Sequence, residues 1–229
     1  MALLQITDLN KIYHRRRPDE MTALADISLV IEPGEAVALT GPSGSGKTTL
    51  LSLLGCMARP TSGNIFLHER NIARLPERFL ARIRRESFGF VFQHYQLLRD
   101  VNVLENVMLP LYPTERSFRE MKAAAGAVLE RFGMLSMAGK KVKQLSGGEQ
   151  QRVAIARALI AQPEVIIADE PTAHLDGDLA RELLRIFQDL HGEGTTLIMA
   201  THDPLLAQAP FVQHRIRLRF GRIEEDLLL

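Results

Sequence analysis

Residues Gly41 to Thr48 carry the clearest chemical pattern in this chain of 229 residues. They read Gly-Pro-Ser-Gly-Ser-Gly-Lys-Thr, which fits the spacing G-x-x-x-x-G-K-[ST]. The glycines let backbone N–H groups turn inward around an anion, and the N-terminus of a following helix adds partial positive charge. From average residue usage, the bare pattern occurs by chance in about one chain of this length in a hundred. The pattern predicts a site for the phosphates of a nucleotide.

The side chains within this loop have different expected tasks. Lys47 is expected to reach the β- and γ-phosphates, Thr48 to place its hydroxyl on Mg²⁺, and Thr49 to donate to a phosphate oxygen. The phosphate-binding residues expected from the loop are Gly41, Ser43, Gly44, Ser45, Gly46, Lys47, Thr48 and Thr49. A flexible Gly/Ser turn is the alternative interpretation. An apolar strand before the loop and a helical stretch after it favour the phosphate site, because the mechanism needs both.

Two carboxylates follow a second apolar stretch. Val165 to Ala168 predicts a buried strand, and Asp169 and Glu170 come directly after it. Ligand sites in parallel sheets form at the carboxyl ends of strands, so both acids are expected beside the phosphate loop. Asp169 is then expected to hold the shell of Mg²⁺, and Glu170 to orient or deprotonate an attacking water. The alternative is a solvated boundary between a strand and a turn.

A second helix start also has features that suit a phosphate. Leu145 to Arg152 precedes an apolar helix predicted over Val153–Ala161, and Ser146 with Glu149 forms a capping-box pattern. Two glycines disfavour the first helical turn, so they indicate that a ligand approaches the bare backbone there. One ATP could hardly use both helix starts of a single compact chain. A second copy of the chain would resolve this.

The elements that must position these residues alternate between strands and helices. The spacing of apolar residues predicts strands at Leu4–Thr7, Asp26–Ile31, Ala36–Thr40, Asn64–Leu67, Phe88–Phe92, Val165–Ala168, Thr195–Ala200 and His214–Arg219, the last as an edge strand. Helices are predicted at Lys47–Gly55, Val153–Ala161 and Gly177–Leu190, with a helical, polar stretch over Leu97–Gln144. Arg15–Glu20 is expected to be a solvated polar loop. This order predicts an α/β fold with a mainly parallel sheet and helices on both faces.

The composition excludes several classes of protein. Lys and Arg number 28 against 27 Asp and Glu, so the net charge of +1 gives no electrostatic case for nucleic acid as the main partner. Cys56 is the only cysteine, which excludes an intramolecular disulfide framework and favours a reducing compartment. The chain has no apolar run of the ~18 to 20 residues that a membrane-spanning helix needs, and Met1–Lys11 does not resemble a signal peptide. Any role at a membrane is expected to come through a partner.

The motifs, taken in order, resemble those of the ABC family of ATPases. Leu145–Arg152 resembles the ABC signature motif, and it follows the phosphate loop as it does in that family. Gln93 resembles the Q-loop glutamine, a sensor of Mg²⁺ and the γ-phosphate, and His202 resembles the switch histidine that contacts the γ-phosphate. Ala173–Asp176 is similar to the D-loop, although relatives usually have Gly-Asn where this chain has Ala-His. Tyr13 stands where the family has an aromatic ring that stacks on adenine.

This resemblance implies a single ABC ATPase domain over residues 1–229. It would have a P-loop NTPase core, an N-terminal antiparallel β subdomain and an inserted α-helical subdomain at 94–144, with 1–93 and 145–229 forming the rest. Two chains would stack head to tail, and each ATP would lie between the phosphate loop of one chain and Ser146, Gly147 and Gly148 of the other. The implied catalytic residues are Lys47, Gln93, Glu170 and His202; the implied Mg²⁺ ligands are Thr48, Gln93 and Asp169; Tyr13 and Asp176 complete the nucleotide site.

A narrower resemblance concerns the membrane partner. Tyr95–Leu98, Leu104–Val107 and Thr61–Gly63 resemble the subgroup of lipoprotein-release, macrolide-export and cell-division ATPases. It implies a subunit on the cytoplasmic face of the cell membrane, docked to an integral permease through a groove in His94–Lys143. An ATP-dependent regulatory or scaffolding subunit of a cell-division-type complex is the alternative.

A soluble ABC ATPase of DNA repair or translation is disfavoured because the chain has no coiled-coil insertion and no tandem head. A small-molecule kinase would have no use for the second helix start.

Overall fold

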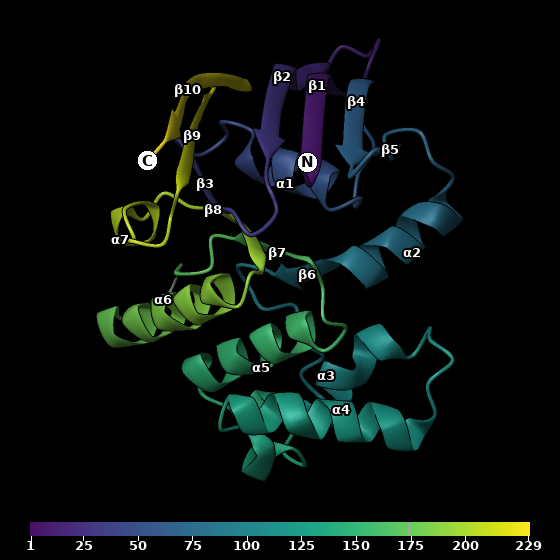
Figure 1. Ribbon diagram of the computed structural model, residues 1–229, viewed down its shortest axis with the longest axis vertical. Helices are drawn as coiled ribbons and strands as arrows, with labels where there is room; N and C mark the ends of the chain where they lie inside the picture. Colours follow the sequence, from purple (N-terminus) through teal and green to yellow (C-terminus); the bar gives the residue numbers. More distant parts are fainter. Residues whose placement is uncertain (174) are drawn as a thin grey trace.

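The computed structural model describes residues 1–173 and 175–229 as two β-sheets with helices packed around them (Figure 1). The strands are β1 (Leu4–Tyr13), β2 (Met21–Ile31), β3 (Ala36–Thr40), β4 (Ser62–Leu67), β5 (Arg70–Asn71), β6 (Phe88–Val91), β7 (Val165–Asp169), β8 (Thr196–Ala200), β9 (His214–Arg219) and β10 (Arg222–Leu228). The α-helices are α1 (Lys47–Leu54), α2 (Glu77–Ser87), α3 (Val103–Met108), α4 (Phe118–Arg131), α5 (Gly147–Leu159), α6 (Gly177–Gly192) and α7 (Pro204–Ala207). Three short 3₁₀ helices are η1 (Leu109–Leu111), η2 (Leu135–Met137) and η3 (Val142–Gln144).

The first sheet is antiparallel and has the order β2-β1-β4-β5, which confirms the expected N-terminal antiparallel subdomain. Its inner face packs on α1, which lies beneath β1 and β2 in Figure 1. In β1, Leu4, Ile6 and Leu9 are buried between exposed neighbours, so the alternation in the sequence marks the face toward the core. β1 and β2 are both longer than the predicted strands because they continue to pair with each other through bulges as far as Tyr13 and Met21.

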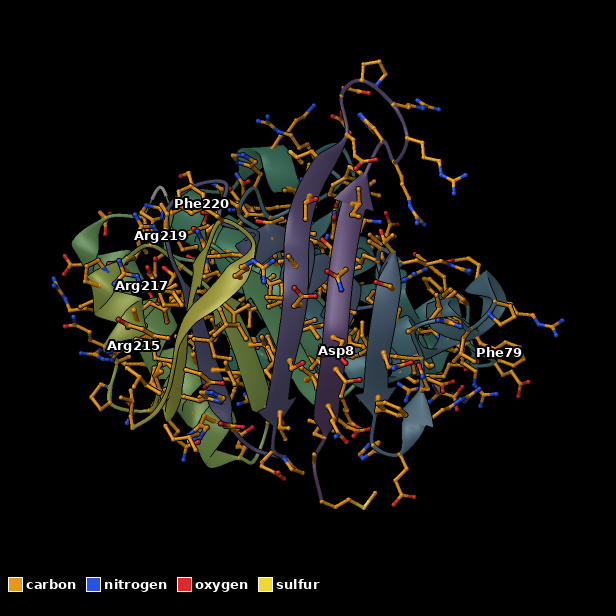
Figure 2. The ribbon with its side chains drawn as sticks, turned by 90° about the horizontal axis from the view of Figure 1, so that it is seen from above. Asp8, Phe79, Arg215, Arg217, Arg219 and Phe220 are labelled. Atoms are coloured by element: carbon orange, nitrogen blue, oxygen red, sulfur yellow. The ribbon has the colours of Figure 1, made fainter. Side chains whose placement is uncertain are left out.

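The second sheet has the order β10-β9-β3-β8-β7-β6, and its strands from β9 to β6 are parallel. The prediction that His214–Arg219 is an edge strand is wrong, because β9 lies between β3 and β10. Its alternation has another cause. His214, Ile216 and Leu218 are buried, while the intervening arginines lie on a face that is open to solvent (Figure 2). Alternating burial along a strand therefore shows that one face of the sheet is exposed there. It does not show that the strand lies at the edge of the sheet.

Successive residues of β3 point into two different cores. Val37 and Leu39 join the core shared with α1 and the antiparallel sheet. Ala36 and Ala38 face the opposite core, which α6 fills with Leu183, Leu190 and the fully buried Phe187. Both faces of the parallel sheet are thus covered, which confirms the predicted α/β arrangement with helices on each side.

Helices α3 and α4 form a third core with α5 in the lower part of Figure 1. α5 belongs to two cores, because Ile155 and Ala158 join the core that contains α6 while Val153 and Ala156 join the core with α3 and α4. Buried Asn106 on α3 accepts a hydrogen bond from Leu98 N (2.7 Å) and donates to the carbonyls of residues 98, 101 and 102. None of the helices in the two described ranges is both long and apolar enough to cross a membrane.

A buried histidine attaches the C-terminal strand to the rest of the sheet. Nδ1 of His214 lies 2.7 Å from Glu35 Oε1, before β3, and its Nε2 pairs with Asp226 on β10. The hydrogen bond that His214 donates to Glu35 raises the pKa of His214 despite burial, and the contact with Asp226 adds to the increase. A raised pKa in the folded state stabilises the fold below the pKa of the unfolded histidine, about 6.5, and this contribution is lost as the pH rises through the folded value.

We therefore expect His214→Gln to lower the free energy of unfolding by about 2 kcal/mol at pH 6, the scale of hydrogen bonds to charged groups. The loss should be smaller at pH 9, because the stabilisation that comes from the raised pKa is lost as the pH rises. Urea unfolding of both proteins at the two pH values measures this difference. His191→Gln is the control, because His191 contacts the neutral amide of Gln213 at 3.1 Å. An equal loss at both pH values for His214→Gln would contradict the expectation.

Candidate functional site

The phosphate loop joins β3 to α1 at the carboxyl edge of the parallel sheet. Its three glycines, Gly41, Gly44 and Gly46, all have positive φ, with values of 132°, 78° and 106°. Gly46 is the N-cap of α1 and no side chain of the described residues caps this helix end, so backbone N–H groups are available there. Ser45 Oγ is buried and has no hydrogen-bond partner among the described residues. A loop with free donors and left-handed glycines fits the predicted phosphate site.

Lys47 lies within the curve of this loop. Its side chain is 8% exposed, and Nζ donates to Gly41 O at 2.8 Å and to Pro42 O at 3.3 Å. The ammonium is also 3.8 Å from Glu170 Oε1. A buried cation held mainly by backbone carbonyls keeps a strong capacity to bind an anion that enters the loop.

Thr48 and Asp169 are in contact, as the sequence predicts for two groups that share one metal ion. Thr48 Oγ1 donates to Asp169 Oδ1 at 3.1 Å. Burial raises the pKa of Asp169, and the neighbouring Glu170 raises it further. A bound cation would relieve both effects. Within residues 1–173 and 175–229, no three His, Cys, Asp or Glu side chains form a metal-binding cluster.

Glu170 and His202 form a direct contact that the sequence did not reveal. Glu170 Oε2 lies 2.8 Å from His202 Nδ1 and accepts a hydrogen bond from His202 N at 3.2 Å. The two residues follow β7 and β8, which are parallel neighbours, and Glu170 N extends the pairing by donating to Ala200 O. Glu170 has a φ of 47°, a conformation that is uncommon outside glycine and recurs at functional sites. The carboxylate is therefore fixed between Lys47 and His202.

Gln93 follows β6, the edge strand beside β7. Val91 pairs with Ala168, so Gln93 follows β6 beside the end of β7, where Asp169 is the last residue. The loop after Gln93 is held by Arg157 of α5, whose guanidinium donates to Tyr95 O and Gln96 O, both at 2.6 Å. Arg157 was not among the predicted site residues, since an arginine inside an apolar helix carries no ligand-binding pattern of its own.

Tyr13 lies at the end of β1 and pairs in register with Met21 of β2. Two and three residues further along β2, Ala23 and Leu24 line the space beside Gly46. Tyr13 therefore lies on the strand next to the one that touches the phosphate loop. Its ring is half-buried, and Lys11 Nζ lies 4.8 Å from the ring centroid.

The second helix start is away from the phosphate loop, since α1 and α5 lie on opposite sides of the parallel sheet (Figure 1). Ser146 caps α5 in a full capping box with Glu149, so the ordinary explanation of this pair holds. A Cβ on Gly148 would lie 2.6 Å from Leu179 of α6, so packing accounts for that glycine. A Cβ on Gly147 would meet no atom within 4 Å, and its backbone faces open space.

The segment after Glu170 ties the second helix start to the carboxylates. Gln151 of α5, buried and absent from the predictions, donates to Pro171 O at 2.9 Å. Asp176 is the N-cap of α6, where its Oδ1 accepts hydrogen bonds from Asp178 N and Leu179 N. Of the predicted D-loop, His174 lies outside the described residues.

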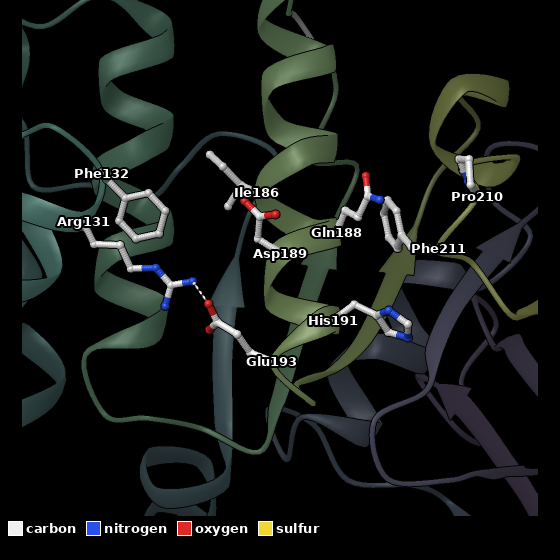
Figure 3. Close-up of a pocket in the computed structure, with 10 residues that line it drawn as sticks. Arg131, Phe132, Ile186, Gln188, Asp189, His191, Glu193, Pro210 and Phe211 are labelled. Atoms are coloured by element: carbon white, nitrogen blue, oxygen red, sulfur yellow. Dashed lines mark hydrogen bonds and ion pairs between the residues drawn. The ribbon is translucent and has the colours of Figure 1, made fainter.

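A separate cavity of about 800 Å³ lies between the C-terminal ends of α4 and α6 (Figure 3). None of the predicted site residues lines it. Arg131 and Glu193 cross its mouth as an ion pair of 2.6 Å, and both side chains are about half exposed. The predicted nucleotide site therefore does not include this cavity.

Comparison with known proteins bears on this site. A family model described as ABC transporter matches residues 24–173, and one described as "AAA domain, putative AbiEii toxin, Type IV TA system" matches the shorter range 141–207. The chain is 42% identical over 224 residues to the macrolide export ATP-binding/permease protein MacB of Hyphomonas neptunium, a match over 98% of this chain and 34% of that protein. It is 43% identical to the uncharacterized ABC transporter ATP-binding protein YvrO of Bacillus subtilis, over 90% of each. The chain spans about a third of the length of the MacB relatives.

Comparison with solved structures also matches the chain to ATP-binding cassettes. The dimeric post-hydrolysis state of the ATP-binding cassette MJ0796, bound to ADP and Pi, has a TM-score of 0.89 at 36% identity and matches 99% of this chain and 98% of that one. CbiO1 from Clostridium perfringens, part of the ABC transporter complex cbiONQ, has a TM-score of 0.85 at 29% identity over 98% of this chain and 88% of that one. The chain therefore belongs to the ABC transporter family and is one of its ATP-binding, ATP-hydrolysing cassettes.

Proposed function

We propose that this chain is the ATPase subunit of a membrane transport or force-transmitting complex, in which two copies close head to tail around two ATP molecules. The observation that carries the proposal is the pair of helix starts, at Gly46 and at Ser146, which lie on opposite sides of one chain. The open backbone at Gly147 suits an approaching phosphate from a second copy. The dimeric structures of MJ0796, 36–37% identical, support this arrangement.

In this proposal the chain binds Mg²⁺–ATP with residues from both ends of the sequence. The phosphate loop and Lys47 would hold the phosphates, Tyr13 would stack on adenine, and Thr48 and Asp169 would hold Mg²⁺ with Gln93 nearby. Mg²⁺ would supply charge neutralisation on the phosphate oxygens. Asp176 is the N-cap of α6, and the loop that carries it would approach the ATP site of the other copy.

Glu170 would accept a proton from the attacking water. Its buried carboxylate has the ion pair with Lys47 on one side and the contact with His202 on the other. These two contacts, one to each carboxylate oxygen, would hold the Glu170 side chain in place while a water approaches, and His202 would also reach the γ-phosphate. Because Ser146 and Gly147 would come from the other copy, hydrolysis would require a closed dimer.

The membrane partner would dock in a groove of about 490 Å³ between α2 and the end of α5. Aromatic side chains line its floor, and its rim is basic; the lining arginines are Arg78, Arg82, Arg84, Arg85 and Arg157. Such a groove suits an amphipathic helix with acidic side chains. The segment expected to carry the groove, residues 94–143, contributes only Pro110 and Pro113 to the lining. Arg157 also holds the loop after Gln93, which would connect docking with the nucleotide site.

Two matched substitutions of exposed methionines test the docking surface. Met57 lines the groove and is 46% exposed, whereas Met21 lies on β2 and is 56% exposed. We expect Met57→Asp to abolish retention of the chain in the membrane fraction of cells that contain its partner, because the new carboxylate would replace apolar contact area and would repel the acidic side chains of the partner helix. Met21→Asp should leave retention unchanged, and both variants should keep wild-type ATP affinity. Equal retention of both variants would reject this groove as the docking site.

The proposal puts the chain at the cytoplasmic face of the cell membrane, held there by its partner. The MacB relatives support a partner of permease type, since their names join an ATP-binding part and a permease in one protein. Residues 94–144 would form the helical subdomain of the cassette, with α5 linking it to the core.

A further inference from the structure

The turn between the last two strands touches the phosphate loop from the far end of the chain. Figure 2 shows this hairpin beside β2, with Arg219 and Phe220 at its turn. Gly221 N donates to Ser45 O at 3.1 Å, and Gly221 O accepts from Ala25 N at 2.8 Å. The Gly221 residue thus bridges the phosphate loop and strand β2 with its own backbone.

The contact is so close that backbone meets backbone. A Cβ on Gly221 would lie 2.7 Å from Ala23 O and 3.0 Å from Ala23 C, and Gly221 has a φ of 74°. A Cβ on Gly46 would lie 2.8 Å from Ala23 O and 3.6 Å from Gly221 Cα. On the other side, a Cβ on Gly41 would lie 2.1 Å from Leu218 O of β9. Both ends of the phosphate loop are therefore packed against the last hairpin or its neighbour β2.

Side chains fix the hairpin without filling this contact. Arg222 Nη1 lies 3.0 Å from Asp26 Oδ2 of β2, and Arg219 pairs with Glu224 across the turn. Phe220 is 83% exposed, so its ring takes no part in the contact. The turn consequently acts through the position of its backbone, and Gly221 is the residue on which that position depends.

We propose that Gly221 is a positioning residue for nucleotide binding, which sets the Ser45–Gly46 peptide and hence the direction of Lys47. The proposal rests on the phosphate-binding role of the loop given under the proposed function. The Ser45 carbonyl is fixed by Gly221 N, so the next peptide N–H groups are directed into the loop. Displacement of the turn would rotate this peptide and misalign the donors for a phosphate.

The test compares three variants of the turn, with ADP plus Mg²⁺ as the probe. Gly221→Ala is expected to raise the Kd for ADP at least tenfold and to raise KM for ATP more than it lowers kcat. Gly221→Asn should be equally impaired, because asparagine tolerates positive φ but its Cβ still meets Ala23 O. Phe220→Ala is the matched control and should bind ADP within twofold of wild type. Wild-type affinity in Gly221→Ala, or recovery in Gly221→Asn, would overturn the proposal.

A measurement on the unaltered protein covers the case in which Gly221 variants do not fold. Hydrogen exchange should slow in residues 219–222 when ADP binds, together with residues 41–48, because the Gly221 N–H is bonded to Ser45 O. Protection of 41–48 without any change in 219–222 would overturn the proposal. The phosphate-binding role itself is judged separately by Lys47→Ala, so failure of the one is distinguishable from failure of the other.

Discussion

Lys47→Ala is expected to raise the Kd for ATP by about 100-fold, the equivalent of about 3 kcal/mol for a lost charged hydrogen bond. The ammonium is buried in the loop and is held mainly by the carbonyls of Gly41 and Pro42, which cannot attract a phosphate. Alanine removes the one cation in this position while leaving the glycine geometry of the loop unchanged. The glycines alone would still provide N–H groups, so weak binding should remain.

Titration with a fluorescent ATP analogue measures this loss. Lys122→Ala is the control, because Lys122 is an exposed lysine on α4, outside the proposed site. It should bind ATP like the wild type. If Lys47→Ala also bound with unchanged affinity, the phosphate loop would not be the nucleotide site.

Glu170→Gln is expected to lower the rate of ATP hydrolysis at least 100-fold, since a general base contributes about 10²- to 10⁴-fold to such reactions. Glutamine has nearly the same shape and can still accept the hydrogen bond from His202 N, so the local fold should persist. It cannot take a proton from water. ATP should therefore still bind, and it should accumulate on the protein instead of turning over.

Release of inorganic phosphate measures this effect. Glu193→Gln provides a control of the same chemistry, because Glu193 pairs with Arg131 at the distant cavity of Figure 3. Hydrolysis by Glu193→Gln should match the wild type. Wild-type hydrolysis by Glu170→Gln would mean that another group activates the water.

The sequence predicted the site where the chemistry depends on consecutive residues. Gly41–Thr48 and the pair Asp169–Glu170 each follow a short apolar strand, and both lie where that context indicated. The contact between Glu170 and His202 was beyond such reasoning, because it depends on which strands are neighbours. β8 lies between β3 and β7 although it follows β7 in the chain, and periodicity carries no information about this order.

Helix α2 and strand β10 were not predicted from the sequence, because each contains few apolar residues that pack on the core. α2 is dominated by arginine and glutamate, and Leu80 is its only buried residue among those described. β10 is largely exposed, with Ile223 alone partly packed on the core. α2 packs on the core through Leu80 and Ile83 alone, and β10 is ordered mainly by pairing with β9 and by ion pairs, so hydrophobic spacing gave only a weak signal for either element. Hydrophobic spacing also could not predict the contact of Gly221 with the phosphate loop, because that contact joins backbone groups that are far apart in the chain.

If two copies of this chain share each ATP, the mass of Glu170→Gln in solution should depend on the nucleotide. Analytical ultracentrifugation should give a single chain of 25.6 kDa without nucleotide and a particle of twice that mass with Mg²⁺–ATP. Adding Ser146→Arg should return the variant to the mass of one chain even in saturating ATP, because the arginine would block the second helix start. A Glu170→Gln protein that binds ATP and stays monomeric, or a doubly substituted protein that still dimerises, would show that two copies do not share each ATP through the second helix start.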